Sequence, residues 1–207
     1  MTDRYDAILF DFDGVLVDSE PVHFKCWKEV IAPFGVDLTW DLYATTCIGV
    51  SDREMIHAFA SRLGVDFDQL WAQYPRKKEL FRARNQAAIQ FQPETVDLVR
   101  ELNAHYPMAV VSSSARVEVE PVLVHGGIRD YFAALVCGSE VANLKPAPDP
   151  YLRAAELLGA AKPLVVEDSD AGEQSGRAAG FDVLRVGDAA TMPRTLQAHL
   201  NGRGLIQ

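Results

Sequence analysis

The chain has 207 residues, of which 48% are hydrophobic, and a formal net charge of −9 at pH 7. This composition is sufficient for a sizeable buried core, either in one large domain or in a domain that carries an insertion. The negative charge argues against broad electrostatic binding to nucleic acid or to an anionic membrane, and we expect neither as a partner. A site for an anionic ligand must therefore be built locally, from a metal ion, a helix N-terminus and one or two cations.

Cysteine usage and the N-terminus indicate a reducing compartment. Cys26, Cys47 and Cys137 are widely spaced and form neither a Cys-x-x-Cys pair nor a zinc-binding pattern, so we expect them to be reduced and partly buried. No apolar run approaches the length of a membrane span, and the charged N-terminus is unlike a signal peptide. We expect a soluble cytoplasmic protein, and we expect it to be a monomer.

The first predicted strand runs from Tyr5 to Phe10 and is followed by a long helical block. From Ala7 the strand is apolar throughout, as in strands that are buried on both faces of a parallel sheet. Between residues 20 and 89 the pattern predicts helices at 21–31, 51–64 and 70–89, the second opened by a capping box of Ser51 and Glu54. A helical block of about 70 residues without a convincing strand predicts an inserted second domain.

Strands and helices alternate after the helical block. Strands are predicted at 108–111, 135–137, 164–166 and 183–186, and helices at 93–103, 116–126, 150–158 and 171–179, the third of these with Asp149 as its N-cap. This alternation predicts an α/β fold with a doubly wound, Rossmann-like parallel-sheet core and right-handed crossovers. The core domain would comprise residues 1–16 and 92–207, and the inserted helical domain residues 17–91. The pattern leaves the order of the strands open.

Polar side chains follow four of the predicted strands. They are Asp11 and Asp13 after the first strand, Ser112, Ser113 and Ser114 after the second, Lys145 after the third, and Glu167 and Asp168 after the fourth. Because the carboxyl ends of parallel strands share one edge of the sheet, where such folds bind ligands, we expect these side chains to converge. The simpler alternative for the first group is an ordinary polar turn in which Gly14 has a positive φ.

The predicted cluster has the chemistry of phosphoryl transfer. Several carboxylates in one cleft require a cation, and oxygen ligands without histidine or cysteine favour Mg²⁺. Lys145 would supply a fixed positive charge for a substrate anion, and the serines a hydroxyl and backbone N–H groups. An aspartate beside them can attack phosphorus and form an aspartyl-phosphate, while Asp13 can protonate the leaving oxygen and later take a proton from water.

With these residues the chain resembles haloacid dehalogenase superfamily phosphatases of the β-phosphoglucomutase-like group, which carry a helical cap after the first strand. The matching motifs, in order, are Asp11-Phe-Asp13-Gly-Val-Leu-Val-Asp18-Ser-Glu20, Ser112 in Val-Val-Ser-Ser-Ser, Lys145 in Leu-Lys-Pro-Ala-Pro-Asp, and Glu167-Asp168-Ser-Asp-Ala-Gly172. The resemblance covers essentially the whole chain. It implies that Asp11 is the nucleophile, that Asp13 is the general acid and base, and that Ser112 and Lys145 bind the transferring phosphoryl group.

The resemblance also implies a metal site, formed by the Asp11 carboxylate, the Asp13 carbonyl, Asp168 and Glu167. The cap departs from the sugar phosphate mutases of the group, which carry an arginine directly after Gly-Val-Ser to bind a second phosphate. This chain has Asp52 there and Arg53 one position later. One position turns a helical side chain by about 100°, so Arg53 is a poor substitute, and Asp52 would repel a second phosphate. We therefore expect an Mg²⁺-dependent phosphatase that hydrolyses a small phosphorylated metabolite, with sugar phosphates as the expected class.

Candidate substrate-binding residues come from both predicted domains: Ser113, Ser114, Arg116, His23, Gly49, Asp52, Arg53 and Lys77. His23 matches a histidine of the mutases, so a β-phosphoglucomutase-type activity stays open as an alternative. The basic run from Arg76 to Arg84 could bind substrate, but such runs are more typical of a solvated helix face. A receiver-like phospho-acceptor switch is a further alternative. It shares the aspartate, hydroxyl and lysine but lacks an acid and base in the position of Asp13, and it has no cap.

Overall fold

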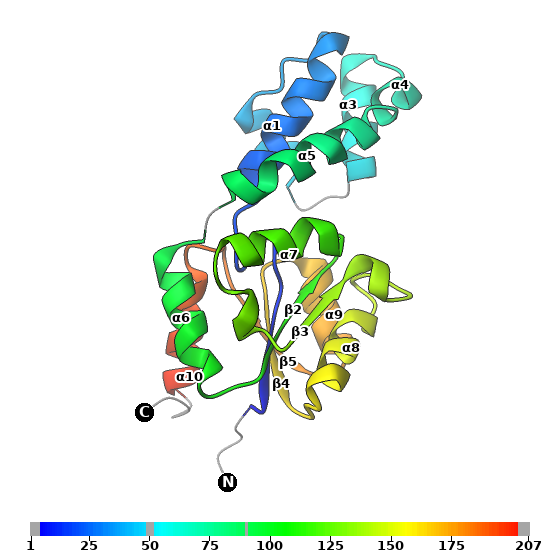
Figure 1. The fold of residues 1–207 in the computed structure, drawn as a ribbon. Helices are drawn as coiled ribbons and strands as arrows, with labels where there is room; N and C mark the ends of the chain where they lie inside the picture. Colours follow the sequence, from blue (N-terminus) through cyan, green and yellow to red (C-terminus); the bar gives the residue numbers. More distant parts are fainter. Residues whose placement is uncertain (1–4, 49–51, 90, 203–207) are drawn as a thin grey trace. The chain divides into compact units, whose positions relative to one another are not determined.

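The structure is a computed structural model that describes residues 5–48, 52–89 and 91–202. The chain divides into two compact units, a core unit of residues 1–18 and 89–207 and a helical unit of residues 19–88 (Figure 1). The domain boundaries expected after residues 16 and 91 lie two residues before and three residues after the boundaries of these units.

The core unit is built on a five-stranded sheet in which every pair of neighbours is parallel. The strands are β1 (Ala7–Phe10), β2 (Met108–Ser112), β3 (Ala134–Cys137), β4 (Pro163–Glu167) and β5 (Asp182–Arg185). Their order is β3-β2-β1-β4-β5, so β1 is central, with Leu9 level with Ala109 on one side and Val165 on the other. The predicted α/β fold class is confirmed, and each predicted strand is present with ends that differ by at most two residues.

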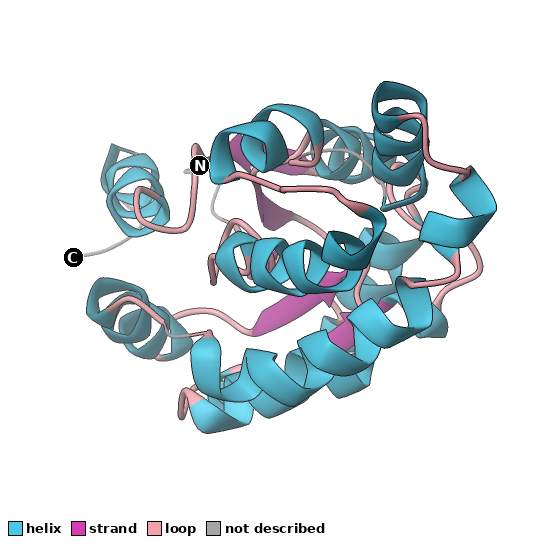
Figure 2. Cartoon of the chain, turned by 90° about the horizontal axis from the view of Figure 1, so that it is seen from above, coloured by secondary structure: helices cyan, strands magenta, loops and turns pink. Residues whose placement is uncertain are grey.

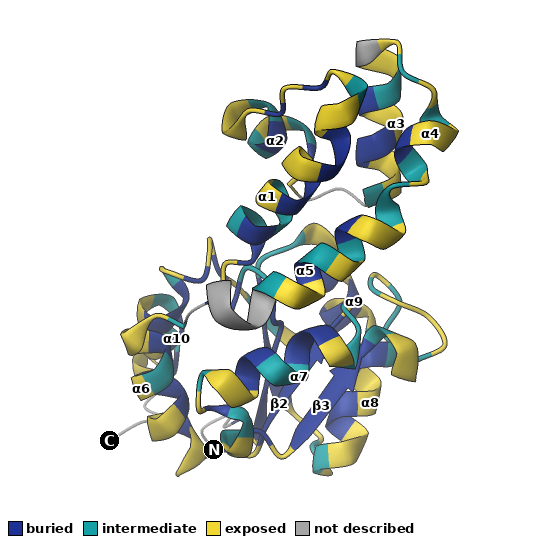
Figure 3. Cartoon of the chain, turned by 45° about the horizontal axis from the view of Figure 1, so that its top comes forward, coloured by how far each residue is buried: buried dark blue, intermediate teal, exposed yellow. Residues whose placement is uncertain are grey.

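Burial explains why these apolar runs form strands. β1, β2, β3 and β4 are buried at every position, as the dark blue strands of Figure 3 show, whereas the edge strand β5 is partly exposed. On one face, Leu9 and Val111 belong to an apolar cluster with Tyr151. On the other face, Phe10 meets Phe132 edge to face, with 6.0 Å between ring centroids. Both faces are therefore covered, as parallel sheets require.

Helices cover the sheet on both sides. The core helices are α6 (Pro93–Asn103), α7 (Arg116–His125), α8 (Asp149–Leu158), α9 (Asp170–Ala178) and α10 (Met192–Gly202), with short 3-10 turns η2 (Arg129–Tyr131) and η3 (Gly138–Glu140). Helix α8 packs on β1, β2 and β3, and α9 on β4 and β5. Helices α6 and α10 pack together on the other side of the sheet (Figure 1). Figure 2 shows the strands lying among helices. No sequence signal had indicated α10.

The prediction that Asp149 is an N-cap is wrong. Pro148 holds that position, and Asp149 is already the first helical residue of α8. The Asp149 carboxylate instead accepts a hydrogen bond from Asn143 Nδ2 at 2.9 Å. The carboxylate therefore fixes the loop before the helix and not the helix N-terminus.

The helical unit has its own apolar core and no strand among its described residues. Its elements are α1 (Glu20–Ile31), η1 (Ala32–Phe34), α2 (Trp40–Thr46), α3 (Asp52–Leu63), α4 (Phe67–Trp71) and α5 (Tyr74–Ala88). Trp27, Ile31, Ile56 and Phe59 are fully buried together. Helix α2, which the sequence had not indicated, begins after Thr39, whose hydroxyl oxygen accepts a hydrogen bond from the Leu42 N–H.

One predicted helix is two. The pattern predicted a single helix over 70–89, but α4 ends at Trp71 and α5 begins at Tyr74. Pro75 explains the break, because proline has no N–H to donate and is tolerated in the first turn of a new helix. The predicted capping box at Ser51 lies outside the described residues.

Cys26, Cys47 and Cys137 are all free and buried. Among the helices of the described residues, none combines the length and the apolar character that crossing a bilayer requires.

Lys77 is the residue of the helical unit that departs furthest from expectation. Its side chain is 1% exposed, and its Nζ lies 3.3 Å and 3.1 Å from the two carboxylate oxygens of Asp52. Asp52 Oδ1 also accepts a hydrogen bond from Trp27 Nε1 at 3.0 Å, and the Lys77 ammonium lies 5.2 Å from the Trp27 ring centroid. The assignment of this basic run to a solvated helix face is therefore wrong for Lys77, whose charge is buried and paired.

Removing the charge of Asp52 is expected to destabilise the helical unit. Asp52→Asn keeps an acceptor for Trp27 but leaves the buried Lys77 ammonium without a counter-ion. Breaking a buried pair costs about 3–5 kcal/mol. Because the Asp52 side chain is 31% exposed, we expect the free energy of unfolding in urea to fall by about 1–3 kcal/mol.

An exposed ion pair of the same unit provides the matched control. Glu29 and Arg84 pair at 2.6 Å with side chains 43% and 39% exposed, so Glu29→Gln should cost less than about 1 kcal/mol. If Asp52→Asn is no more destabilising than Glu29→Gln, Lys77 does not depend on Asp52 for its charge balance.

Candidate active site

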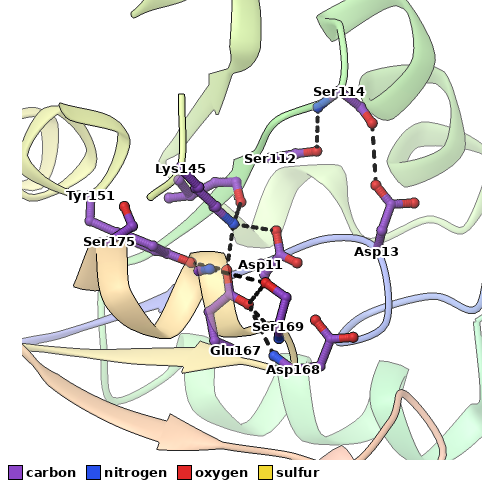
Figure 4. Close-up of polar contacts among 12 residues, drawn as sticks. Asp11, Asp13, Ser112, Ser114, Lys145, Tyr151, Glu167, Asp168, Ser169 and Ser175 are labelled. Atoms are coloured by element: carbon purple, nitrogen blue, oxygen red, sulfur yellow. Dashed lines mark hydrogen bonds and ion pairs between the residues drawn. The ribbon is translucent and has the colours of Figure 1, made fainter. Parts of the chain in front are cut away.

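Side chains from several strand ends meet at the carboxyl edge of the sheet (Figure 4). Asp11 directly follows β1, Ser112 ends β2 and Glu167 ends β4, while Lys145 reaches the same place from the loop between β3 and α8. Parallel strands place these positions on one edge because all of them point in the same direction. The structure therefore brings together residues that are as much as 156 positions apart in the chain, Asp11 and Glu167.

Lys145 is at the centre of this group. Its Nζ donates to Asp11 Oδ1 and to Glu167 Oε1, both at 2.6 Å, and to the Val111 carbonyl oxygen at 3.1 Å. The side chains of Lys145, Asp11 and Glu167 are 6%, 11% and 0% exposed. An ammonium has three protons to donate, so its donor capacity is fully used and its position is fixed.

Both oxygens of Glu167 are held by several donors. Besides Lys145, Oε1 accepts a hydrogen bond from the Tyr151 hydroxyl at 2.7 Å. Oε2 accepts three more, from the backbone N–H groups of Asp168 and Ser169 and from the Ser169 hydroxyl, at 3.0 to 3.1 Å. A carboxylate has about four lone-pair sites, so these donors take up the acceptor capacity of Glu167.

Two glycines make room for the carboxylates. A Cβ at Gly172, in α9, would lie 1.7 Å from Glu167 Oε1, and a Cβ at Gly14 would lie 2.0 Å from Asp168 Oδ2. Gly14 also has a φ of +78°, which disfavours any other residue. The positive φ expected for a polar turn is therefore present, but the turn forms part of the site.

Burial and charge set the protonation of these groups. Burial raises the pKa of Asp11 well above its usual value, although Lys145 opposes this. Burial, and then the neighbouring charge of Glu167, raises the pKa of Asp168 to about 6. For Glu167 the effect of burial is outweighed by Lys145, which lowers the pKa of this carboxyl. Likewise the charges of Asp11 and Glu167 outweigh burial and raise the pKa of Lys145.

The carboxylates have the composition of a site for a hard divalent cation. Asp11, Glu167 and Asp168 each offer an oxygen, and these oxygens lie within 4.8 Å of one another. Oxygen-only donors suit Mg²⁺ or a similar ion. Asp11 and Asp168, whose pKa values are raised, would gain most from a nearby positive charge, whereas Glu167 is already paired with Lys145.

The Asp13 side chain is directed away from this cluster. Its Oδ2 accepts a hydrogen bond from the Ser114 hydroxyl at 3.3 Å, and the Ser114 N–H in turn donates to Ser112 Oγ at 3.0 Å (Figure 4). Asp13 is thus linked to the loop after β2 and stands apart from the carboxylates beside Lys145. Ser113, the third candidate of this loop, is exposed.

Arg116, a candidate substrate-binding residue, makes several contacts within the core unit. Its guanidinium pairs with the Glu140 carboxylate through Nε at 2.5 Å and Nη2 at 2.9 Å, and Nη2 donates to the Leu135 carbonyl oxygen at 2.7 Å. These contacts commit the side chain to joining α7 to β3 and the 3-10 turn η3. Substrate binding by Arg116 stays a prediction.

The candidates in the helical unit are engaged in contacts of their own. His23 stacks on Phe81 with 3.9 Å between ring centroids, and burial, together with the charges of Lys77 and Lys78, lowers its pKa well below the usual value. The Arg53 guanidinium lies 5.1 Å from the Phe67 ring centroid. Gly49 lies outside the described residues.

The pairing of Asp52 corrects one step of the sequence argument. The expectation that Asp52 repels a second phosphate assumed an unbalanced negative charge. In the structure Lys77 neutralises that charge. The balanced charge of Asp52 is therefore a weak argument against a second phosphate.

Sequence reasoning missed Tyr151 and Ser169 as partners of Glu167. The Ser169 hydroxyl could have been anticipated as an N-cap, since it accepts from the Gly172 N–H at the start of α9. Tyr151 has the pattern of an ordinary core aromatic. Its position in the first turn of the helix that follows Lys145 is the one sequence signal that it carries.

The raised pKa of Asp168 predicts a pH-dependent penalty on the stability of the protein in a chelator. Between the ordinary value of 3.8 and the folded-state value of about 6, the folded state binds more protons than the unfolded state, so stability falls as the pH rises. Allowing for partial exposure, Asp168→Asn should raise the free energy of unfolding in EDTA by about 1–2 kcal/mol at about pH 7.5. This gain should shrink toward about pH 4.

Asp170 supplies the control for this measurement. Its side chain is 90% exposed, so Asp170→Asn should change stability little at either pH. A gain from Asp168→Asn that does not depend on pH would contradict the account of its burial.

The chain is similar in sequence to known phosphatases. Residues 8–186 match the family model described as haloacid dehalogenase-like hydrolase. The chain is 35% identical over 189 residues to the fructose-1-phosphate phosphatase YqaB of Escherichia coli strain K12, covering 90% of this chain and 98% of that one. It is 29% identical over 182 residues to the phosphorylated carbohydrates phosphatase of Thermotoga maritima, covering 86% and 82% of the two chains.

A solved structure extends the likeness to the fold. The crystal structure of a haloacid dehalogenase family hydrolase from Deinococcus radiodurans R1, with bound phosphate and sodium, matches 98% of each chain with a TM-score of 0.75 and 28% identity. The family resemblance found in the four motifs is thereby confirmed, and with it an activity as a phosphoric monoester hydrolase. The chain belongs to the haloacid dehalogenase-like hydrolases.

Proposed function

We propose that the protein is an Mg²⁺-dependent phosphatase of small phosphorylated metabolites, with sugar phosphates as its substrate class, and that it works through an aspartyl-phosphate on Asp11. The observation that carries the proposal is the buried Asp11 carboxylate, held at 2.6 Å by the Lys145 ammonium beside two further carboxylates. The names of the two phosphatase relatives support the substrate class.

In the first step, a carboxylate oxygen of Asp11 attacks the phosphorus atom, and the bond from phosphorus to the ester oxygen breaks. Lys145 places its positive charge beside the phosphoryl oxygens at the point of attack, and the Ser112 hydroxyl and the Ser113 N–H donate hydrogen bonds to them. Asp13 donates its proton to the departing ester oxygen, which leaves as an alcohol.

In the second step, Asp13 takes a proton from a water molecule, and the water oxygen attacks the phosphorus of the aspartyl-phosphate. The bond from phosphorus to the Asp11 oxygen breaks, which releases inorganic phosphate and restores the carboxylate. The hydrogen bond from Ser114 holds Asp13 apart from the carboxylate cluster, in a position where we expect it to exchange its proton with the leaving group and with water.

The metal site fits the same scheme. The proposed ligands are the carboxylates of Asp11 and Asp168 and the main-chain oxygen of Asp13, with Glu167 beside them. Burial raises the pKa values of Asp11 and Asp168, so a bound cation would stabilise the charged forms of these two carboxylates. When bound, Mg²⁺ supplies charge neutralisation for the phosphoryl group and for the attacking carboxylate.

We further propose that the helical unit is the cap that selects the leaving group, as its insertion after β1 suggests. His23, Asp52, Arg53 and Lys77 stay its candidate substrate-binding residues. A β-phosphoglucomutase-type reaction is the alternative, and it needs a cation for a second phosphate. The names of the two phosphatase relatives favour hydrolysis over this alternative. Membership of the hydrolase family argues against the receiver-like switch.

Substitution of Asp11 and Asp13 tests their proposed roles as nucleophile and as general acid and base. Asp11→Asn should abolish magnesium-dependent release of phosphate from an aryl phosphate, because an amide is a poor nucleophile. Asp13→Asn should lower kcat by about 10²–10⁴-fold, the usual contribution of a general acid and base. Steady-state kinetics with and without EDTA provides the measurement.

Asp97→Asn provides the control, because Asp97 lies on α6 with its side chain 73% exposed. The activity of this variant should equal that of the wild type. Intact hydrolysis in Asp13→Asn would show that the proposed mechanism is wrong. A wild type without any magnesium-dependent hydrolysis would remove the proposed function altogether.

Substrate class calls for a separate measurement. Phosphate release should be screened over sugar phosphates, nucleotides and phosphoglycolate, and we expect the highest kcat/KM for a sugar monophosphate. A coupled assay should follow conversion of β-glucose 1-phosphate to glucose 6-phosphate in parallel. Isomerisation that exceeds phosphate release would favour the mutase alternative over hydrolysis.

A further inference from the structure

Tyr151 has its ring in the apolar core and its hydroxyl in the polar network of the site. It lies in the first turn of α8, is 0% exposed, and packs in an apolar cluster with Leu9, Val111 and Val165 of the sheet. Its hydroxyl nevertheless ends at the carboxylate group of the site, where it donates to Glu167 Oε1 at 2.7 Å (Figure 4). The ring belongs to the core, and the hydroxyl belongs to the polar network.

We propose that Tyr151 is a positioning residue for Lys145, acting through the carboxylate of Glu167. The proposal rests on the proposed function, since Lys145 is taken there to bind the transferring phosphoryl group. Nothing in the motifs of the sequence assigns Tyr151 a role in the reaction.

The geometry supports this because Tyr151 and Lys145 share one acceptor atom. Glu167 Oε1 accepts from the Lys145 ammonium at 2.6 Å and from the Tyr151 hydroxyl at 2.7 Å. The Lys145 Nζ also lies 5.0 Å from the centroid of the Tyr151 ring. The hydroxyl therefore fixes the oxygen that Lys145 binds, and the ring limits the space on one side of the ammonium.

The remaining contacts of Glu167 show what the hydroxyl adds. Three donors from Asp168 and Ser169 hold Oε2, and Oε1 is held by Lys145 and Tyr151 alone among the contacts of the described residues. Without the hydroxyl, Lys145 would be the sole donor to Oε1. The ammonium could then move toward Glu167 and away from Asp11, which it holds at an equal 2.6 Å.

Loss of that balance should affect the chemical step more than substrate binding. Lys145 makes its contact beside the oxygen of Asp11 that attacks phosphorus, so a displaced ammonium leaves the charge of the transition state less well balanced.

Tyr151→Phe tests the proposal, because it keeps the ring and removes the hydroxyl. We expect kcat for an aryl phosphate to fall by about tenfold, the usual effect of losing a hydrogen bond to a charged group, while KM changes by less than about twofold. In a Lys145→Ala background, Tyr151→Phe should cause no further loss of kcat, because the residue acts through Lys145.

Tyr106→Phe is the matched control. Tyr106 is also a buried tyrosine, 3% exposed, but it precedes β2 at the opposite end of the strand from Ser112. Its variant should keep the kcat and KM of the wild type, and melting temperatures of both variants should be measured alongside.

The outcomes separate this inference from the proposed function. If the wild type releases phosphate and Tyr151→Phe leaves kcat unchanged, the inference alone is overturned. The same holds if Tyr151→Phe lowers kcat as much in the Lys145→Ala background as in the wild type. A fall in kcat that Tyr106→Phe reproduces, with an equal fall in melting temperature, shows a structural role and overturns it too. Absence of phosphate release by the wild type overturns both the function and the inference.

Discussion

The site depends on one ammonium that bridges two buried carboxylates. Lys145 lies 2.6 Å from both Asp11 and Glu167, and all three side chains are nearly or fully buried. Charges in such a place are costly unless they are paired and hydrogen-bonded. One lysine cannot balance two carboxylates and the neighbouring Asp168 as well. Burial, and after it the neighbouring negative charge, raises the pKa values of Asp11 and Asp168, and a divalent cation beside them would oppose this effect.

The fold supplies this arrangement at the end of its central strands. Strands β1, β2 and β4 deliver Asp11, Ser112 and Glu167 to one edge, and the loop after β3 brings Lys145 to them. Gly172 lets the backbone of α9 approach Glu167 closely enough that no Cβ would fit. The stability of the sheet and the placement of the reactive groups therefore have a common origin in the burial of four apolar strands.

Much of this could be predicted from the sequence, because it follows from local patterns. Apolar runs ending in polar residues marked the strands, and alternation with helices required a shared edge for Asp11, Ser112 and Glu167. Contacts that depend on packing could not be predicted. Strand order has no local signature, the burial of Lys77 depends on Asp52 and on the rings around it, and Tyr151 looks like any core aromatic until its hydroxyl is placed beside Glu167.

In the proposed mechanism the phosphoryl group is bound covalently to Asp11 between the two steps. The most direct measurement is an acid quench of Asp13→Asn during turnover of an aryl phosphate, followed by location of the phosphoryl group by peptide mass spectrometry. An aryl oxygen can leave without protonation, so loss of Asp13 should slow the second step more than the first. The intermediate should then accumulate, and we expect one phosphoryl group on the peptide that contains Asp11. A phosphoryl group on another residue, or turnover that leaves Asp11 unmodified, would contradict the account.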